Sequence, residues 1–115
     1  MQYLLMLYAD EKAVQAWSKE QGARTMVAYT QYTEALKKSG VYLGSNRLQR
    51  TTTATTVRAR NGERSAIDGP YAETKEQLGG YYLIEAPSRE AALEWAARCP
   101  GASHGAVEVR PVWTI

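Results

Sequence analysis

The chain has 115 residues, of which 44% carry apolar side chains and 23% are charged, with 14 Lys and Arg against 12 Asp and Glu. A chain of this length buries enough surface to fold as one compact domain without staples, and its lone cysteine, Cys99, excludes an internal disulfide. A net charge of +2 argues against a polyanionic partner. We therefore expect a single domain over residues 1–115 and no direct binding of nucleic acid.

The N-terminal segment predicts an unprocessed, cytoplasmic protein. Residues 1–8 contain no basic leader, and their short apolar run ends before Asp10. No apolar stretch elsewhere approaches the roughly 18 residues that span a bilayer. We therefore expect no membrane contact.

The first half of the chain reads as strand, helix, strand. Residues 2–8 predict a strand whose two alternating sets of side chains are both apolar or aromatic, so that both of its faces are expected to be covered. Helical spacing of apolar residues follows over residues 10–39, with a break expected at Gly22 and an end signal at Gly40. A second strand is expected over residues 41–48.

A β-hairpin is expected next. Residues 51–57 form a β-branched run, and Asn61-Gly62 is a pair typical of a two-residue hairpin turn. That turn fixes four opposing pairs: Arg60 and Glu63, Arg58 and Ser65, Val57 and Ala66, and Thr55 and Asp68. The opposite charges of the first pair support this register.

The second half repeats the strand, helix, strand order. Residues 77–85 predict a strand that contains Gly79-Gly80, where we expect a bulge or close packing of strands. Ser88 predicts the N-cap of a helix through Arg98, and residues 106–112 predict the last strand. The order βαβ, hairpin, βαβ predicts an α+β, ferredoxin-like sandwich with both helices on one face of an antiparallel sheet.

The helix-free face of this sheet predicts a homodimer. The strands at residues 2–8 and 81–84 carry bulky side chains on both faces. A soluble monomer would then expose a large apolar area. We expect two copies to pack sheet against sheet.

The stretch Asp68-Gly-Pro-Tyr-Ala-Glu-Thr-Lys-Glu-Gln-Leu-Gly-Gly80 resembles the YCII-related family, in the subgroup named for a DGPF motif. Similar segments at residues 3–8, 53–58, 92–97 and 107–112 extend the resemblance over nearly the whole chain. It implies a dimeric α+β barrel, and members of the subgroup are mostly uncharacterised. Two departures are visible: Tyr71 replaces the Phe of the motif, and the long helix lacks the histidine of a His and Asp pair proposed as the active site in YCII-type relatives.

Asp68 is the first candidate for chemistry, because the hairpin register places it on the same face as Val57 and Ala66. A partly desolvated carboxylate there is suited to act as a general acid or base. The alternative is structural, since an Asp before Gly-Pro can bond its own backbone and set a bend. We expect a small-molecule cleft near this bend.

Lys75, Arg110 and Glu73 are the candidate substrate-binding residues, with Lys75 expected to fold back towards Asp68 and bind an acidic or carbonyl substrate. The alternative is a set of solvated charges. His104 is a weaker candidate for proton transfer, and the alternative is an exposed loop residue. No metal site and no cofactor is expected, because no Cys or second His lies at ligand spacing.

Three functions remain open from the sequence. The first is a cofactor-free acid/base enzyme. The second is a non-catalytic accessory protein, because some members of the subgroup are associated with extracytoplasmic-function sigma factors, and a transcription-related partner would dock on the basic cluster of Arg47, Arg50, Arg58, Arg60 and Arg64. The third is a sensor that holds a metabolite without converting it.

Overall fold

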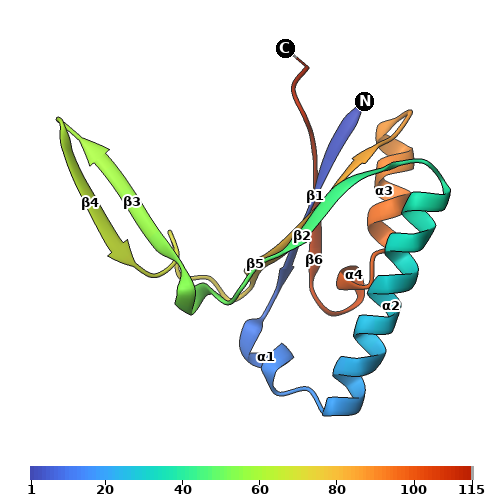
Figure 1. The fold of residues 1–115 in the computed structure, drawn as a ribbon, viewed down its shortest axis with the longest axis horizontal. Coiled ribbons are helices and arrows are strands. Elements are labelled where there is room, and N and C mark those ends of the chain that lie inside the picture. Colours follow the sequence, from blue (N-terminus) through green and yellow to red (C-terminus); the bar gives the residue numbers. More distant parts are fainter. Residues whose placement is uncertain (115) are drawn as a thin grey trace.

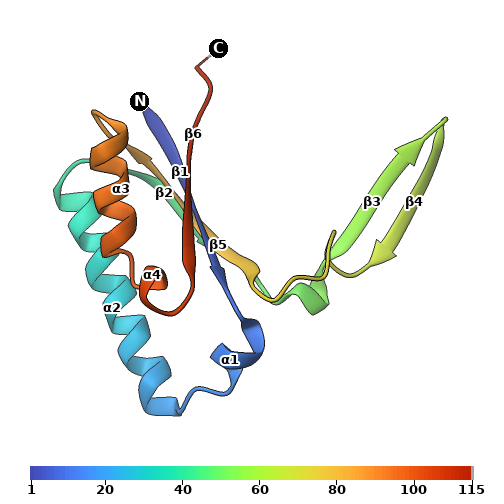
Figure 2. The same cartoon turned by 180° about the vertical axis from the view of Figure 1, so that it is seen from behind.

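The computed structural model describes residues 1–114 and shows a four-stranded antiparallel sheet with two long helices on one face (Figures 1 and 2). The sheet order is β2-β5-β1-β6, which is the ferredoxin-like order. The elements are β1 Gln2–Ala9, α1 Glu11–Gln15, α2 Lys19–Lys38, β2 Tyr42–Arg47, the 3-10 turn η1 Thr51–Thr53, β3 Thr55–Arg60, β4 Glu63–Asp68, β5 Gln77–Glu85, α3 Arg89–Arg98, α4 Gly101–His104 and β6 Ala106–Pro111. The predicted order of βαβ, hairpin, βαβ is confirmed.

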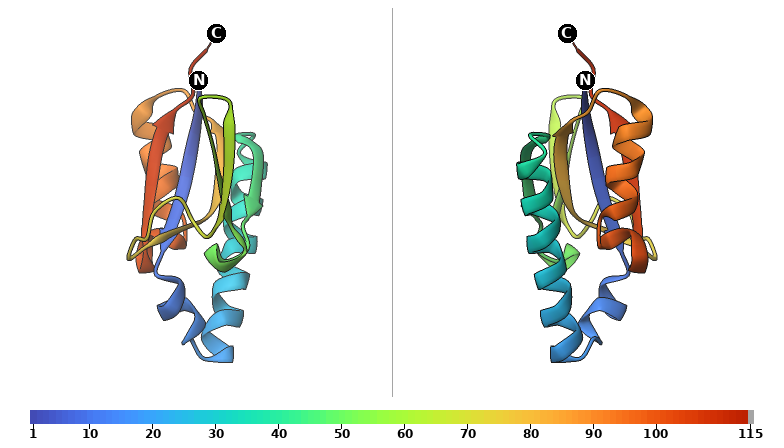
Figure 3. Two further views of the ribbon diagram at one scale, coloured as in Figure 1. Left: turned by 90° about the vertical axis from the view of Figure 1, so that its left-hand side faces the viewer. Right: turned by 90° about the vertical axis from the view of Figure 1, so that its right-hand side faces the viewer.

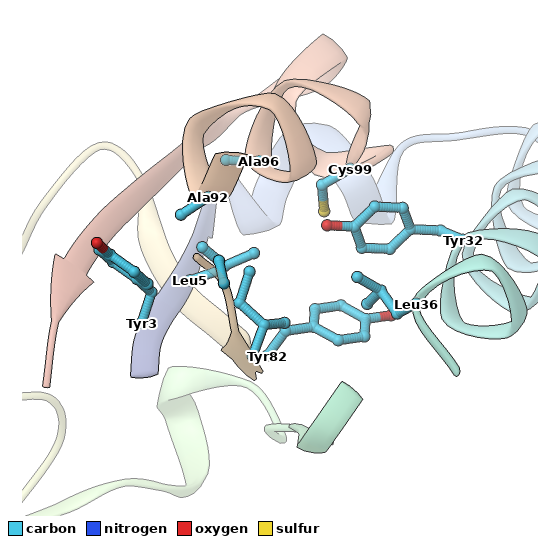
Figure 4. Close-up of a cluster of buried hydrophobic side chains, with 10 residues drawn as sticks. Tyr3, Leu5, Tyr32, Leu36, Tyr82, Ala92, Ala96 and Cys99 are labelled. Atoms are coloured by element: carbon cyan, nitrogen blue, oxygen red, sulfur yellow. The ribbon is translucent and has the colours of Figure 1, made fainter. Parts of the chain in front are cut away.

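The core lies between the sheet and the helices (Figure 4). Leu5 of β1 and Ile84 of β5 are fully buried, because alternate side chains of each strand point to the helix face. Leu36 of α2 and Cys99 after α3 close over them. The prediction that Cys99 packs as a small apolar residue is confirmed.

Two buried phenols tie the layers together. The hydroxyl of Tyr32 donates to the main-chain carbonyl of Trp95 at 2.7 Å, which links α2 to α3. The hydroxyls of Tyr82 and Thr33 lie 2.8 Å apart, which links β5 to α2. Each buried tyrosine therefore has the polar partner that its hydroxyl requires.

The predicted break at Gly22 is wrong. The chain leaves the helix between α1 and α2, where Ser18 takes an extended conformation and its hydroxyl accepts from the amide of Gln21. Ser18 is thus the N-cap of α2, and the helix begins at the next residue, Lys19. Gly22 lies inside α2, and its amide bonds the carbonyl of Ser18.

Gly79-Gly80 forms both predicted features. The pairing of β1 with β5 skips Gly79, because Leu7 faces Gly80 and Tyr8 faces Leu78, so that Gly79 is the extra residue of a bulge. A Cβ on Gly80 would lie 2.8 Å from the carbonyl oxygen of Asn46, so β2 approaches closer than any side chain allows.

The hairpin of residues 55–68, here called the arm, leaves the main sheet and forms a separate two-stranded sheet (Figures 1 and 3). Its register matches the predicted pairs, and Asn61 (φ 51°) and Gly62 (φ 78°) both take the left-handed conformation of a type I′ turn. The radius of gyration is 16.1 Å, against about 13 Å for a compact chain of this length. The arm accounts for this extended shape.

The other face of the main sheet, here called the open face, has no helix over it. It carries the side chains of Leu4, Met6, Tyr81 and Leu83, all partly exposed. The expectation that both faces of β1 are covered is therefore not met within a single chain. Among residues 1–114, no helix is long and apolar enough to cross a membrane.

Candidate functional site

A cleft of about 690 Å³ lies on the helix side of the sheet, where β1 ends and α2 begins. We call it the helix-side cleft. Its walls come from the ends of β1, β2 and β5, from α1 and the first half of α2, and from α4. Segments from both βαβ halves therefore meet in this cleft.

Aromatic side chains form one wall of the cleft. The rings of Trp17 and His104 meet edge to face, with centroids 4.8 Å apart and planes at 89°. Tyr29 of α2 lies beside them, and a Cβ on Gly101 would come within 2.8 Å of its hydroxyl. The glycine at the start of α4 therefore makes room for this ring.

Two cations without a carboxylate partner in the described part of the chain also line the cleft. Arg47 and Arg50 both line the cleft, and neither makes a salt bridge with any group of residues 1–114. Glu11 is the acidic residue of the lining, but its carboxylate accepts from the amide and hydroxyl of Thr51 at 2.9 and 3.0 Å. The cleft therefore combines flat apolar walls with a net positive charge.

Desolvation shifts the pKa of two groups in this cleft, and for His104, whose side chain is exposed, this desolvation is partial. It lowers the pKa of His104 below the ordinary value, which favours the neutral imidazole that can accept a proton. Desolvation also raises the pKa of Tyr29, which keeps this phenol protonated as a hydrogen-bond donor.

Asp68 lies elsewhere, at the end of β4 on the arm. Its side chain is exposed in the single chain, and no group of residues 1–114 donates a hydrogen bond to its carboxylate. The bend after it comes from Gly69, which has φ 121° and bonds Ala54 through its amide and Thr56 through its carbonyl. Within residues 1–114 the Asp68 side chain therefore does not set the bend through a hydrogen bond, and its role as an acid or base stays a prediction.

Lys75, Glu73 and Arg110 are also outside the helix-side cleft. Lys75 and Glu73 are exposed in the loop before β5, and within the described range Lys75 makes no ion pair with Asp68. Arg110 lies on the open face, where its Nε donates to Glu108 at 3.0 Å. The structure does not bring these three residues together, and their binding role stays a prediction.

The basic cluster expected around the hairpin divides into two groups. Arg47 and Arg50 precede the arm and line the cleft, whereas Arg58, Arg60 and Arg64 are exposed on the arm. Arg58 stacks on the ring of Tyr71, 5.1 Å from its centroid. The sequence places all five close together along the chain, but the departure of the arm from the sheet separates them in space.

Of the predicted catalytic and substrate-binding residues, His104 lines the cleft; it lies at the end of α4, and its side chain is exposed. Trp17 and Tyr29 were not predicted at this cleft. The helical spacing of Trp17 is typical of a core residue, and the ring it contacts, that of His104, is 87 residues away in the sequence. A cluster of three or more His, Cys, Asp or Glu that could hold a metal ion is absent from residues 1–114. The expectation of no metal and no cofactor stays a prediction.

Comparison with known proteins places the chain in context. The family model of the YCII-related domain matches residues 1–115. The uncharacterized protein R00369 of Rhizobium meliloti (strain 1021) is 43% identical, over 97% of this chain and 92% of that protein. Among solved structures, 5-chloro-2-hydroxyhydroquinone dehydrochlorinase (TftG) from Burkholderia phenoliruptrix AC1100, in complex with 2,5-dihydroxybenzoquinone, superposes with a TM-score of 0.56 at 18% identity, covering 99% of this chain and 94% of that one. At this identity the likeness shows a shared fold.

Proposed function

The chain belongs to the YCII-related domain family, and we propose that it binds a small planar anion, such as an aromatic carboxylate or an enolate, in the helix-side cleft. The observation that carries this proposal is the pairing of aromatic walls, Trp17 and Tyr29, with two guanidiniums that lack a carboxylate partner. Guanidinium groups bind planar oxyanions in a bidentate manner, and aromatic walls favour flat ligands. That a protein of the same fold holds a dihydroxybenzoquinone supports this class of ligand.

His104 is the group of this cleft that is suited to proton transfer. A neutral imidazole beside a bound enol or phenol can take its proton, and Arg47 or Arg50 then stabilises the resulting oxyanion. Such a step needs no cofactor, so a cofactor-free acid/base reaction is the enzymatic form of this proposal. A sensor that binds the anion without converting it is the non-catalytic form.

Asp68 offers a second location for the same chemistry. Its carboxylate is exposed in a single copy, so a partner copy would have to desolvate it there. The two locations are separated by His104→Gln and Asp68→Asn. The cleft proposal expects turnover of an enolisable keto acid to be lost in His104→Gln, whereas Asp68→Asn retains it. The opposite result would transfer the reaction to the bend at Asp68.

Binding is tested with benzoate, salicylate and phenylpyruvate, against benzyl alcohol as the uncharged control, by calorimetry. The charge-assisted contact of one guanidinium contributes about 1.5–3 kcal/mol. Arg47→Gln and Arg50→Gln should therefore each raise the dissociation constants of the anions roughly tenfold or more. Arg60→Gln, on the arm and away from the cleft, is the matched control and should leave affinity unchanged. Equal binding of benzyl alcohol, or equal loss in all three variants, would refute an anion site.

We also infer a homodimer that covers the open face. Leu4, Met6, Tyr81 and Leu83 form an apolar centre on this face, and Glu108 and Arg110 form an ion pair beside it. Apolar centres with polar rims are typical of protein interfaces. Sedimentation equilibrium should give twice the 12.8 kDa chain mass, and Met6→Glu should convert the protein to a folded single copy; a wild-type monomer at micromolar concentration would refute the dimer.

The exposed Arg58, Arg60 and Arg64 of the arm favour one alternative, an accessory protein that docks on an acidic surface. Capture of a purified extracytoplasmic-function sigma factor from the same genome should then depend on these side chains. Charge reversal at all three should abolish the complex, while the Arg47→Gln variant should retain it. Capture that survives charge reversal would reject this alternative.

A further inference from the structure

The arm lacks the packing that a hairpin needs. Val57 and Ile67, on its two strands, are 58% and 63% exposed, and nearly every residue of the arm is exposed in the single chain. A lone two-stranded hairpin is marginally stable in water, because it has no third strand or helix against which to bury its apolar side chains. An arm with this composition is therefore expected to lie against another surface.

Hydrogen bonds hold the segments on either side of the arm. Thr51, before the arm, is bound by Glu11, and the amide of Glu11 donates to the side chain of Gln77, after the arm, at 2.9 Å. At the arm's root the amide of Gly69 donates to the carbonyl of Ala54 at 2.7 Å. These contacts join the flanking segments to α1 and the two ends of the arm to each other.

The arm stands in front of the open face and slants away from it, so that the two enclose a V-shaped space (Figures 1 and 3). Six residues per strand give the arm a length of about 20 Å. A second copy stacked on the open face would lie about 10 Å away, and its helix layer adds about 10 Å. The arm is therefore long enough to reach the helix layer of such a copy.

We propose that the arm of each subunit docks on the helix layer of a second copy of this chain, so that two arms clasp the dimer reciprocally; this rests on the homodimer proposed above. A two-fold axis makes the contact isologous, since each subunit gives one arm and receives one. The helix layer offers an exposed apolar contact, because Leu93 of α3 is 39% exposed, with Glu90 and Arg89 one turn earlier on the same side of the helix. In the register of the arm, Ile67, Arg58 and Arg60 share one face, which presents an apolar side chain and arginines to such a surface together.

The first test removes the arm. Because Ala54 and Gly69 are already joined by a hydrogen bond, residues 55–68 can be replaced by Asn-Gly without moving the rest of the chain. Sedimentation equilibrium should show a dimer dissociation constant at least tenfold weaker than that of the wild type. Far-UV circular dichroism and an unchanged affinity for salicylate, or an unchanged monomer fold by heteronuclear NMR, confirm that the body is intact.

The second test locates the arm. Arg60→Cys protein that carries a nitroxide at the tip of the arm is mixed with isotope-labelled wild-type protein. Cys99 does not take up the nitroxide in the folded protein, because it is buried and burial raises the pKa of its thiol. The clasp predicts broadened amide signals in α2 or α3 of the isotope-labelled copy. A nitroxide on Arg24→Cys, in the exposed first half of α2, is the matched control. It should broaden a different set of amide signals.

The outcomes separate the two proposals. A wild-type protein that sediments as a single copy overturns the dimer and the clasp together. A dimer whose affinity is unchanged by arm removal, or whose isotope-labelled helices show no broadening from the arm, overturns the clasp while the sheet-to-sheet dimer stands.

Discussion

Replacing Tyr32 with Phe tests how the two helices are joined. In α3 the amide of Cys99 donates to Ala96 and not to Trp95, so the hydroxyl of Tyr32 is the donor that reaches the Trp95 carbonyl, at 2.7 Å. Tyr32→Phe leaves this carbonyl without its donor near the core, at a cost of about 1–3 kcal/mol. The loss should exceed that of an ordinary exposed hydrogen bond.

The expected shift follows from the length of the chain. For 115 residues the unfolding entropy is about 0.24 kcal/mol per kelvin, so a loss of about 2 kcal/mol lowers Tm by about 8 °C, measured by calorimetry. Tyr29→Phe is the matched control, because Tyr29 lies one turn earlier in α2 and its hydroxyl bonds no group of residues 1–114. Equal melting temperatures for the two variants would refute the link between α2 and α3.

Three further predictions follow. Gly80→Ala should destabilise the protein by about 1–3 kcal/mol in urea unfolding, because its Cβ would meet the Asn46 carbonyl oxygen at 2.8 Å. Gly79→Ala, whose Cβ would lie 4.0 Å from the nearest atom, should cost less, and equal losses would contradict the close strand approach. Partial desolvation lowers the pKa of His104 in the folded state, so the unfolded state binds the proton more readily. The wild type should therefore lose stability relative to His104→Gln as pH falls from about 7 to 5. Parallel stability curves would show that the imidazole is not desolvated. Cys99, buried and with a raised pKa, should react with a disulfide reagent only at the rate of unfolding, and instant modification in the native state would contradict its burial.

Local patterns in the sequence determined most of the fold. The Asn61-Gly62 turn specified the hairpin register, since its backbone conformation permits one pairing of the flanking strands. Ser88 specified the start of α3 because a side-chain cap satisfies the first amides of that helix. The same local rule acted at Ser18, where the cap, and not Gly22, separates α1 from α2.

The site was decided by tertiary structure. His104 and Trp17 lie far apart in the sequence, and only the packing of α4 beside the α1–α2 connection brings their rings to 4.8 Å. Arg47 and Arg58 are close in the sequence, yet the arm leaves the sheet between them, and neither strand periodicity nor turn chemistry records that departure. Neighbouring residues determine turns and helix caps, because those depend on local backbone conformation. A cleft depends on which distant parts of the chain come into contact, and only the packing of the layers determines those contacts.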